Sequence, residues 1–291
     1  MQRLKEQCLF CLVDRYGKDY PDGCDESKKI AYTQAFFKIL SEANSKEGAP
    51  EIVEKIDLLK IEMFGAKRDF TEIKKHFNDL MLSLEESVYK NIQNSEKPLE
   101  TAIKYAIRGN FIDYGAMRSV DEDKLNELID KANEVELDKT ELEMLYKDLS
   151  SAKNLVLLTD NCGEIVFDKI LIKIIKNMFP EIVIDVITRG MPVLNDATPD
   201  DAKQVGLDTL VCVTGNGTAI GGTCLDRISE ESRKIIDNAD VIISKGMGNF
   251  ETLRACGKNI YYLFMCKCKM FSDMLNVPLY TTMLVNDLRM K

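Results

Sequence analysis

The sequence predicts an α/β protein, with helices throughout its first half and a mainly parallel sheet covered by helices in its second half. Up to about residue 150, apolar residues recur at intervals of three and four, and no alternating strand pattern is found. From Asn154 onward, short apolar runs alternate with helical segments, which is typical of a parallel sheet covered on both faces. The chain has 291 residues, 45% of them hydrophobic, enough for two domains with sizeable cores. We therefore expect a helical domain over residues 1–150 and an α/β domain over residues 151–291.

The helices of the first half are expected where the apolar spacing is most regular. In the longest of them, Ile73, Phe77 and Leu80 share one face. Pro50 suits the first turn of another helix, because its missing N–H has no partner in a first turn. The expected helices cover about residues 9–16, 32–40, 50–63, 71–94, 99–108, 124–133 and 140–149.

Five apolar runs in the second half are expected to be strands. Each is short, and most end in polar or glycine residues, as buried parallel strands do. They occupy residues 155–160, 182–190, 207–215, 239–246 and 259–266. Helices are expected between them over residues 164–178, near Ala202 and over residues 229–237.

Composition and charge exclude several classes of protein. The formal charge is −9, from 39 basic and 48 acidic residues, whereas a general nucleic-acid binder needs a basic face. No apolar run approaches the ~20 residues that span a bilayer, and the first residues lack the unbroken apolar stretch of a signal peptide. Nine cysteines without an export signal indicate reduced thiols. We expect a cytoplasmic protein with no nucleic-acid or membrane partner, of open oligomeric state.

Oxygen-bearing side chains follow the first two expected strands. Asp160 and Asn161 come after the first strand, and Asp196 comes after the second. Ligands of open parallel sheets bind outside the carboxyl ends of the strands, where these side chains should converge. Two carboxylates and an amide suit a hard divalent cation such as Mg²⁺ or Mn²⁺. Alternatively, Asp160 and Asn161 only cap the next helix, and Asp196 caps a turn before Pro199.

A glycine-rich stretch and a lysine follow later strands. Residues 215–222 can present backbone N–H groups to a phosphate, or they form only a flexible crossover loop. The stretch is neither a Walker loop nor a dinucleotide fingerprint, since the required lysine and the required position after the first strand are both missing. Lys245 ends the fourth strand, where it can reach a phosphate as a point charge or lie solvated at the surface.

The cysteines and the one histidine carry weaker signals. Cys8 and Cys11, together with Cys24, Cys266 and Cys268, can form a zinc or iron–sulfur site if the chain ends meet, or they are buried small apolar residues. His76 is the only histidine of the chain and lies in the longest expected helix. A Ser-His-Asp or histidine-phosphatase mechanism is therefore not expected, because His76 is the only histidine that could take part in it.

Taken together, the motifs after the strands resemble a known family. TDNCGEIVFD, TRGMPVLNDAT and ADVIISKGMGNFETL, a later Lys-Cys pair and the stretch GNFIDYG in the helical half are similar to motifs of the damage-control phosphatases, the former domain of unknown function 89. The resemblance spans essentially the whole chain, and the Cys8-x2-Cys11 pair is similar to the prokaryotic, ARMT1-like branch with a CxxC motif.

This resemblance implies a helical N-terminal region packed on a Rossmann-like α/β/α domain. It also implies a divalent-metal-dependent phosphatase acting on sugar phosphates or on damaged phosphometabolites. By the same resemblance, Asp160, Asn161 and Asp196 bind the metal and Lys245 binds the phosphate. Further candidate substrate contacts come from the motifs, the glycine-rich loop and the helical half: Arg189, Asn249, Glu251, Gly215, Asn110 and Asp113. Cys162 departs from the small residue that the family commonly has after the Asp-Asn pair.

The expected mechanism places a metal-bound phosphate monoester against an activated water. Mn²⁺, Mg²⁺, Co²⁺ and Ni²⁺ all suit the oxygen ligands, and Glu164 or Asp196 is the candidate group that orients or deprotonates the water. The helical domain would cover the pocket and select the substrate, a small phosphorylated metabolite. Two other functions stay open: an S-adenosylmethionine-dependent methyltransferase, and a non-catalytic metabolite-binding protein.

Overall fold

The computed structural model describes residues 3–65, 69–109, 132 and 135–290. The expected helix over residues 124–133, most of the GNFIDYG motif and the candidate substrate contacts Asn110 and Asp113 lie outside these residues, apart from Ala132.

The described part of the first half is helical, as the apolar spacing predicts. The helix starts and stops follow local chemistry: the Asp25 side chain accepts a hydrogen bond from Lys28 N, Pro50 lies in a first turn, and Gly65 ends a helix with φ at +80°. The helices are α1 (Glu6–Tyr16), α2 (Glu26–Glu42), α3 (Ala49–Phe64), α4 (Thr71–Gln93), α5 (Pro98–Gly109) and α7 (Lys139–Ser151).

The second half alternates strands and helices, which confirms the predicted fold class. Its elements are β1 (Asn154–Leu158), α8 (Glu164–Met178), β2 (Val183–Thr188), α9 (Pro199–Gln204), β3 (Cys212–Gly215), α10 (Glu230–Asp237), β4 (Val241–Lys245), α11 (Gly246–Leu253), β5 (Ile260–Met265), α12 (Lys269–Leu275) and β6 (Thr282–Asn286). Three of them, α11, α12 and β6, are additions to the elements expected from the sequence. No described helix is both long and apolar enough to cross a membrane.

The strands form one sheet in the order β3-β2-β1-β4-β5-β6. Strands β1 to β5 pair in parallel and β6 runs antiparallel to β5. Successive crossovers therefore run to one side of β1 and then to the other, so that β1 and β4 flank the topological switch point. In their register Leu158 pairs with Ser244, which brings the ends of these two strands level.

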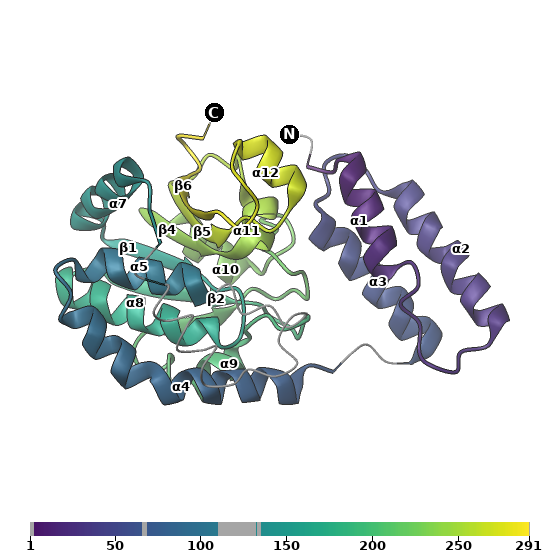
Figure 1. Cartoon of the computed structure of the whole chain (residues 1–291), viewed down its shortest axis with the longest axis horizontal. Helices are drawn as coiled ribbons and strands as arrows, with labels where there is room; N and C mark the ends of the chain where they lie inside the picture. Colours follow the sequence, from purple (N-terminus) through teal and green to yellow (C-terminus); the bar gives the residue numbers. More distant parts are fainter. Residues whose placement is uncertain (1–2, 66–68, 110–131, 133–134, 291) are drawn as a thin grey trace.

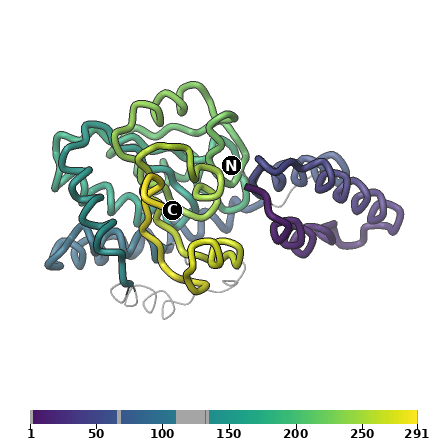
Figure 2. Tube along the Cα trace, turned by 90° about the horizontal axis from the view of Figure 1, so that it is seen from above, coloured from purple at the N-terminus to yellow at the C-terminus, as the bar shows by residue number. Residues whose placement is uncertain are grey.

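Helices cover both faces of the sheet. On one face α4, α5, α7, α8 and α9 share a single core with the strands, so that much of the first half packs directly on the sheet (Figure 1). The core of the other face joins α10, α11 and α12 to the bundle of α1, α2 and α3, which lies to one side of the sheet (Figures 1 and 2). The domain boundary at residue 150 stays a prediction.

Candidate active site

Asp160 lies at the switch point between β1 and β4. It follows β1 by two residues, and its carboxylate packs against Gly246, the first residue of α11. Gly246 has φ at +79°, and a Cβ there would lie 2.0 Å from Asp160 Oδ2. The close approach therefore needs glycine at this position, both for its conformation and for its lack of a side chain. It sets Asp160 against the amino-terminal end of an eight-residue helix, which favours negative charge.

The loop after β2 brings Asp196 to Asn161. Residues 161 and 196 form an isolated antiparallel bridge between two segments that each follow a parallel strand. Around it, Ala197 N donates to Asp160 O at 2.8 Å, and Cys162 N donates to Asn195 O at 2.9 Å. Backbone pairing thus holds the three predicted metal ligands, Asp160, Asn161 and Asp196, in one place.

Arg189 connects the two carboxylates of this group. Its Nε donates to Asp196 Oδ2 at 2.6 Å, and its Nη2 lies 3.4 Å from Asp160 Oδ1. Its Nη1 donates to Asn249 Oδ1 at 2.9 Å. The arginine is 1% exposed, so these protein groups surround the guanidinium.

Asn161 is oriented by three neighbouring side chains. Its amide nitrogen donates to Asp160 Oδ2 at 2.7 Å and to Glu164 Oε2 at 3.1 Å, and its oxygen accepts from Asn195 Nδ2 at 2.6 Å. Glu164 is fully buried and also accepts from the Asn161 backbone N–H. Glu164 therefore reaches Asn161, while its burial separates it from solvent water.

Lys245 lies beneath this group and is fully buried. Its ammonium donates to Ala106 O at 2.9 Å, to Asp168 Oδ1 at 2.7 Å and to a carboxylate oxygen of Glu164. An ammonium has three donors, so all three are occupied by protein oxygens. A phosphate contact by Lys245 would have to replace one of them.

Burial shapes the charges of the site. Burial, together with the charges of Asp196 and Glu164, raises the pKa of Asp160 to about 8. Burial also raises the pKa of Asp196, although the Arg189 guanidinium acts in the opposite direction. Burial raises the pKa of Asp168 to about 7, against the effect of Lys245. Burial alone would lower the pKa of Lys245, but the neighbouring carboxylates outweigh it and raise that pKa.

The residues present fit a hard divalent cation. Burial and the charges of Asp196 and Glu164 raise the pKa of Asp160, and a bound cation would act against both effects. The described residues contain no group of three or more His, Cys, Asp or Glu side chains suited to a metal, and the donor set expected from the sequence is two carboxylates and one amide. Oxygen donors of this kind leave further positions for water or substrate. The side chain of Asp160 is 13% exposed, in contrast to the fully buried Glu164 and Lys245.

The alternative capping roles are not observed. The N-cap of α8 is Gly163, and no side chain caps that helix. The N-cap of α9 is Thr198, which forms a capping box with Asp201. Asp160, Asn161 and Asp196 therefore have no capping role at these two helices.

The other predicted site residues divide into two groups. Asn249 belongs to the network, because its amide nitrogen donates to Thr159 O at 3.0 Å and to Lys245 O at 2.8 Å. Glu251, two residues further along α11, accepts from Ala49 N at 2.7 Å and so joins α11 to α3. That contact leads away from Asp160 toward the helical bundle.

The glycine-rich loop is used for close backbone packing. A Cβ on Gly215 would lie 3.1 Å from Gly190 Cα, and one on Gly190 would lie 2.1 Å from Gly217 N. Asn216 Oδ1 accepts from Gly190 N at 2.9 Å and from Thr218 N at 2.9 Å. The loop therefore packs on the segment that carries Arg189. Its role as a phosphate cradle, Gly215 included, stays a prediction.

The described cysteines form no disulfide, and among the five candidate metal ligands Cys8 and Cys266 are buried while Cys11 is exposed. Among the residues in the described ranges they take part in no metal-binding cluster. His76 packs edge-on against Phe77, at 5.5 Å between ring centroids.

Two residues of the site escaped the sequence analysis. Asn78 of α4 is fully buried and accepts from Gly163 N at 2.6 Å, which holds the turn after Asn161. Asp168 accepts from Lys245 as described above. Both are polar residues within apolar helix faces: Asn78 follows Phe77, and Asp168 lies one turn after Glu164. A polar residue on a buried stripe is the signal that identifies such positions.

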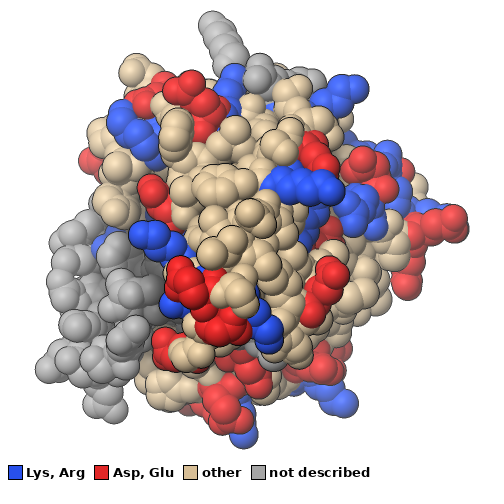
Figure 3. Space-filling view, turned by 90° about the vertical axis from the view of Figure 1, so that its right-hand side faces the viewer, with Lys and Arg blue, Asp and Glu red and all other residues tan. Residues whose placement is uncertain are grey.

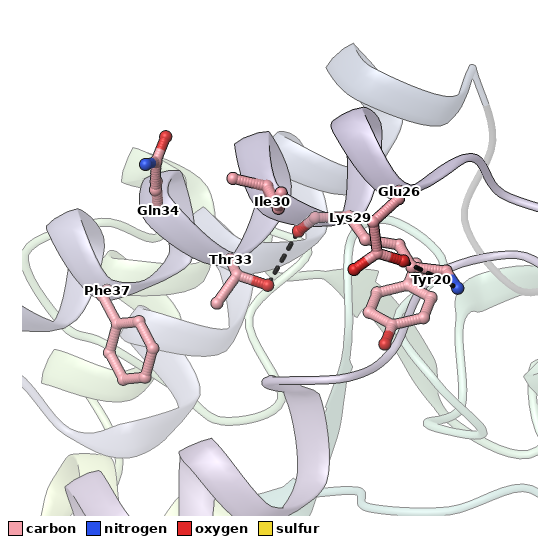
Figure 4. A pocket seen from close by; sticks show the side chains of 7 residues that line it. All are labelled: Tyr20, Glu26, Lys29, Ile30, Thr33, Gln34 and Phe37. Carbon is pink, nitrogen blue, oxygen red and sulfur yellow. Dashed lines mark hydrogen bonds and ion pairs between the residues drawn. The ribbon is translucent and has the colours of Figure 1, made fainter.

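Two hollows have linings that include none of Asp160, Asn161 and Asp196. One, of about 240 Å³, runs along α2 and is lined by Tyr20, Glu26, Lys29, Ile30, Thr33, Gln34 and Phe37 (Figure 4). The other, of about 560 Å³, lies between the start of α4 and the segment from Pro192 to Gln204. The bundle end of the molecule shows charges of both signs around a largely uncharged centre (Figure 3). That face offers no continuous basic surface.

The sequence and the structure both match known proteins. Residues 4–283 match the family model described as the damage-control phosphatase ARMT1-like domain. A damage-control phosphatase of Pyrococcus horikoshii is 32% identical over 281 residues, covering 95% of each chain. One of Archaeoglobus fulgidus is 29% identical over 272 residues, covering 92% of this chain and 93% of that one. The crystal structure of a DUF89 family protein from Pyrococcus horikoshii aligns over 99% of both chains with a TM-score of 0.83 and 26% identity.

Proposed function

This chain belongs to the ARMT1-like damage-control phosphatase family, and we propose that it is a phosphatase that uses a divalent metal to hydrolyse phosphate monoesters of small metabolites. Membership confirms the resemblance drawn from the motifs; its prokaryotic CxxC branch stays a prediction. The observation that carries the metal-dependent part of the proposal is the convergence of Asp160, Asn161 and Asp196 at the switch point between β1 and β4.

Asp160, Asn161 and Asp196 would hold the cation through their side-chain oxygens. When bound, a divalent ion supplies charge neutralisation of the phosphoryl oxygens and a lowered pKa of a bound water. Mg²⁺, Mn²⁺, Co²⁺ and Ni²⁺ all accept this donor set. The carboxylates take their positions from the backbone bridge, and Asn161 takes its own from Glu164 and Asn195.

The chain's own groups then set the geometry of the reaction. The N–H groups at the start of α11, next to Asp160, are donors for phosphoryl oxygens, which favours charge developing in the transition state. Of the two candidate water-orienting groups, Asp196 is 5% exposed and Glu164 is fully buried with both oxygens engaged. We therefore assign water orientation to Asp196 and the positioning of Asn161 to Glu164.

Lys245 enters the proposal in two steps. In the described state its single positive charge pairs with both Glu164 and Asp168, and all three side chains are buried. If one N–H of Lys245 exchanged its present acceptor, such as Ala106 O, for a phosphoryl oxygen, Lys245 would make the phosphate contact that the family resemblance implies. The second step is an expectation from the family resemblance.

The test is metal-dependent hydrolysis of p-nitrophenyl phosphate by the full chain. We expect Asp160→Asn and Asp196→Asn each to reduce turnover with Mn²⁺ by at least about 100-fold, the scale on which loss of electrostatic transition-state stabilisation acts. The control is Asp208→Asn, an exposed carboxylate whose loss should leave turnover unchanged. Circular dichroism checks that each variant folds. Full activity in both site variants, or activity that survives chelation of the metal, refutes the proposal.

The range of substrates is tested separately. Phosphate release from a panel of sugar phosphates, with each of the four metals, should show hydrolysis of small phosphomonoesters. Hydrolysis of none of them by the folded, metal-loaded protein contradicts the proposed substrate class.

A further inference from the structure

Arg189 is the most constrained side chain at the site. Its guanidinium donates to four side chains: to Asp196 at 2.6 Å, Asn249 at 2.9 Å, Thr223 at 3.4 Å and Asp160 at 3.4 Å. It is 1% exposed, although it follows a strand whose end faces the ligand side of the sheet. Four of its five N–H donors are therefore directed to protein groups, and the side chain is almost completely buried.

The groups around Arg189 are themselves anchored. Asn249 is tied to the end of β1 through Thr159 O and to the end of β4 through Lys245 O. Thr223 Oγ1 donates to Asn249 Oδ1 at 2.8 Å, and Thr223 N donates to Thr252 Oγ1 at 2.9 Å. The guanidinium is therefore anchored to the ends of β1 and β4 through Asn249, and to the end of the glycine-rich loop through Thr223.

This arrangement determines how the two carboxylates meet. Arg189 engages Oδ2 of Asp196 and Oδ1 of Asp160, while the other oxygen of Asp160, Oδ2, accepts from Asn161 Nδ2 at 2.7 Å. Two neighbouring carboxylates repel each other, and a planar fork between them fixes their separation and orientation.

We propose that Arg189 is a positioning residue, which presents Asp160 and Asp196 to the metal and does not contact the substrate. The inference rests on the proposed function and assigns Arg189 a role different from the substrate contact expected from its motif. Outer-shell partners of metal ligands act in this way, through the ligands they orient.

The sign of the effect on metal affinity separates geometry from charge. Removing a positive charge beside a cation site would by itself strengthen cation binding. If Arg189 acts by positioning, Arg189→Met instead weakens Mn²⁺ binding, by about tenfold to 100-fold, the range typical of outer-shell partners. Arg189→Lys keeps the charge but loses the fork, and it should also bind Mn²⁺ more weakly than the unchanged chain.

The experiment is calorimetric titration of the chelator-treated full chain with Mn²⁺ alone. Arg233→Met, at an exposed arginine of α10, is the matched control and should bind as the unchanged chain does. Thr223→Val, which removes one anchor of the guanidinium, gives a milder variant should Arg189→Met fail to fold, and it too should lose affinity.

Kinetics with p-nitrophenyl phosphate at saturating Mn²⁺ provide the second readout. We expect Arg189→Lys to lower kcat with KM changed by less than about threefold, because no ground-state substrate contact is lost. Unchanged Mn²⁺ affinity in Arg189→Lys and Thr223→Val, or a KM raised tenfold or more with Mn²⁺ affinity intact, overturns the inference. If the unchanged chain binds no Mn²⁺, the proposed metal site fails as a whole, which is a different result.

Discussion

At the scale of single residues, Gly246 shows how backbone conformation can define a site. It joins β4 directly to α11, and its φ of +79° turns the chain so that the new helix starts against the Asp160 carboxylate. Gly257 has a similar φ of +77°, but no atom lies within 4 Å of where its Cβ would be. The two glycines share the conformational requirement and differ in the contact.

This pair predicts the result of a single methyl group. Gly257→Ala should cost about 1 kcal/mol of unfolding free energy, from the left-handed conformation alone. Gly246→Ala should cost more, because its methyl displaces Asp160, and it should reduce Mn²⁺-dependent turnover by at least about 100-fold if the carboxylate loses its place. Urea unfolding and p-nitrophenyl phosphate turnover measure the two effects. Equal losses of activity in both variants would show that the contact with Asp160 is unimportant.

Residue chemistry could be predicted from the sequence where a rule of the fold applies. Asp160, Asn161 and Asp196 follow the strands after which ligands bind, so their convergence was expectable. The partners of Lys245 could not be predicted. The sequence does not indicate whether a lysine at the end of a strand is solvated or paired with two buried carboxylates. Asn78 was missed because its target, Gly163 N, lies 85 positions away in the chain.

At the scale of elements, α9 is held by charge. Asp201 in its first turn accepts from Thr198 N at 2.8 Å and from Thr198 Oγ1 at 2.6 Å, and pairs with Lys74 of α4 at 2.7 Å. Burial would raise the pKa of Asp201, but the hydrogen bonds from Lys74 and Thr198 outweigh it and lower that pKa below its ordinary value. This one carboxylate thus caps α9 and joins it to α4, close to the loop that carries Asp196.

The lowered pKa of Asp201 predicts a pH-dependent effect. A carboxylate with a lowered pKa stabilises the fold above its unfolded pKa of about 4, and the stabilisation is lost as pH falls through the folded value. Asp201→Asn keeps an acceptor oxygen for Thr198 but leaves Lys74 buried without its charged partner, so it should lower the unfolding free energy at pH 7 by about 2–4 kcal/mol. The difference in unfolding free energy between Asp201→Asn and the unchanged chain should become smaller as the pH falls from 6 to 3.

Urea unfolding at several pH values measures this difference. Asp237→Asn is the control, since Asp237 is also paired with basic side chains, Arg233 and Lys258, but lies exposed, and its effect should be smaller at every pH. A difference for Asp201→Asn that stays constant with pH would show that the charge of Asp201 is not what stabilises α9.

Most elements could be predicted from the sequence, including the six-residue α9 and the eight-residue α10, but α11, α12 and β6 could not. The 23 residues of α4 show a clear helical spacing of apolar residues, and β1 to β5 are identified by their short, continuous apolar runs. Helices α11 and α12, of eight and seven residues, each follow a strand almost at once and have too few turns for a periodic pattern. Strand β6 pairs antiparallel with β5 across a long-range contact, which an alternation of strands and helices does not foresee.

At the scale of the whole molecule, two cores divide the chain in a way that its sequence order does not suggest. Helices α4, α5 and α7 precede the sheet in the sequence but share a core with α8 and the strands. The bundle of α1, α2 and α3 lies to one side (Figure 2) and meets the rest through contacts such as Glu251 to Ala49 N at 2.7 Å and Arg227 to Glu54 at 3.0 Å. The sequence predicts where helices form, but which face of the sheet they cover depends on tertiary packing.

The position of the bundle to one side of the sheet predicts that the bundle can open while the sheet stays folded, even though its core is continuous with that of α10, α11 and α12. Phe36 is fully buried and stacks on Tyr32 inside the bundle, at 6.2 Å between ring centroids. Phe264 is equally buried in β5, where it stacks on Phe250 at 4.8 Å. Each Phe→Ala change should lower a free energy of opening by about 3–5 kcal/mol. For Phe36→Ala this is the opening of the bundle, and for Phe264→Ala it is the unfolding of the sheet.

Hydrogen exchange followed by mass spectrometry distinguishes the two levels. Phe36→Ala should speed exchange in α1, α2 and α3 while the amides of β1, β4 and α8 keep their protection, because the core on the opposite face of the sheet contains no bundle residue and stays packed. Phe264→Ala should speed exchange throughout, because its loss destabilises the sheet on which every other element packs. Asp160 and Asp196 follow strands β1 and β2 of the sheet, so Mn²⁺ binding should survive Phe36→Ala. Equal loss of protection across the chain in Phe36→Ala would show that the bundle and the sheet unfold as one unit.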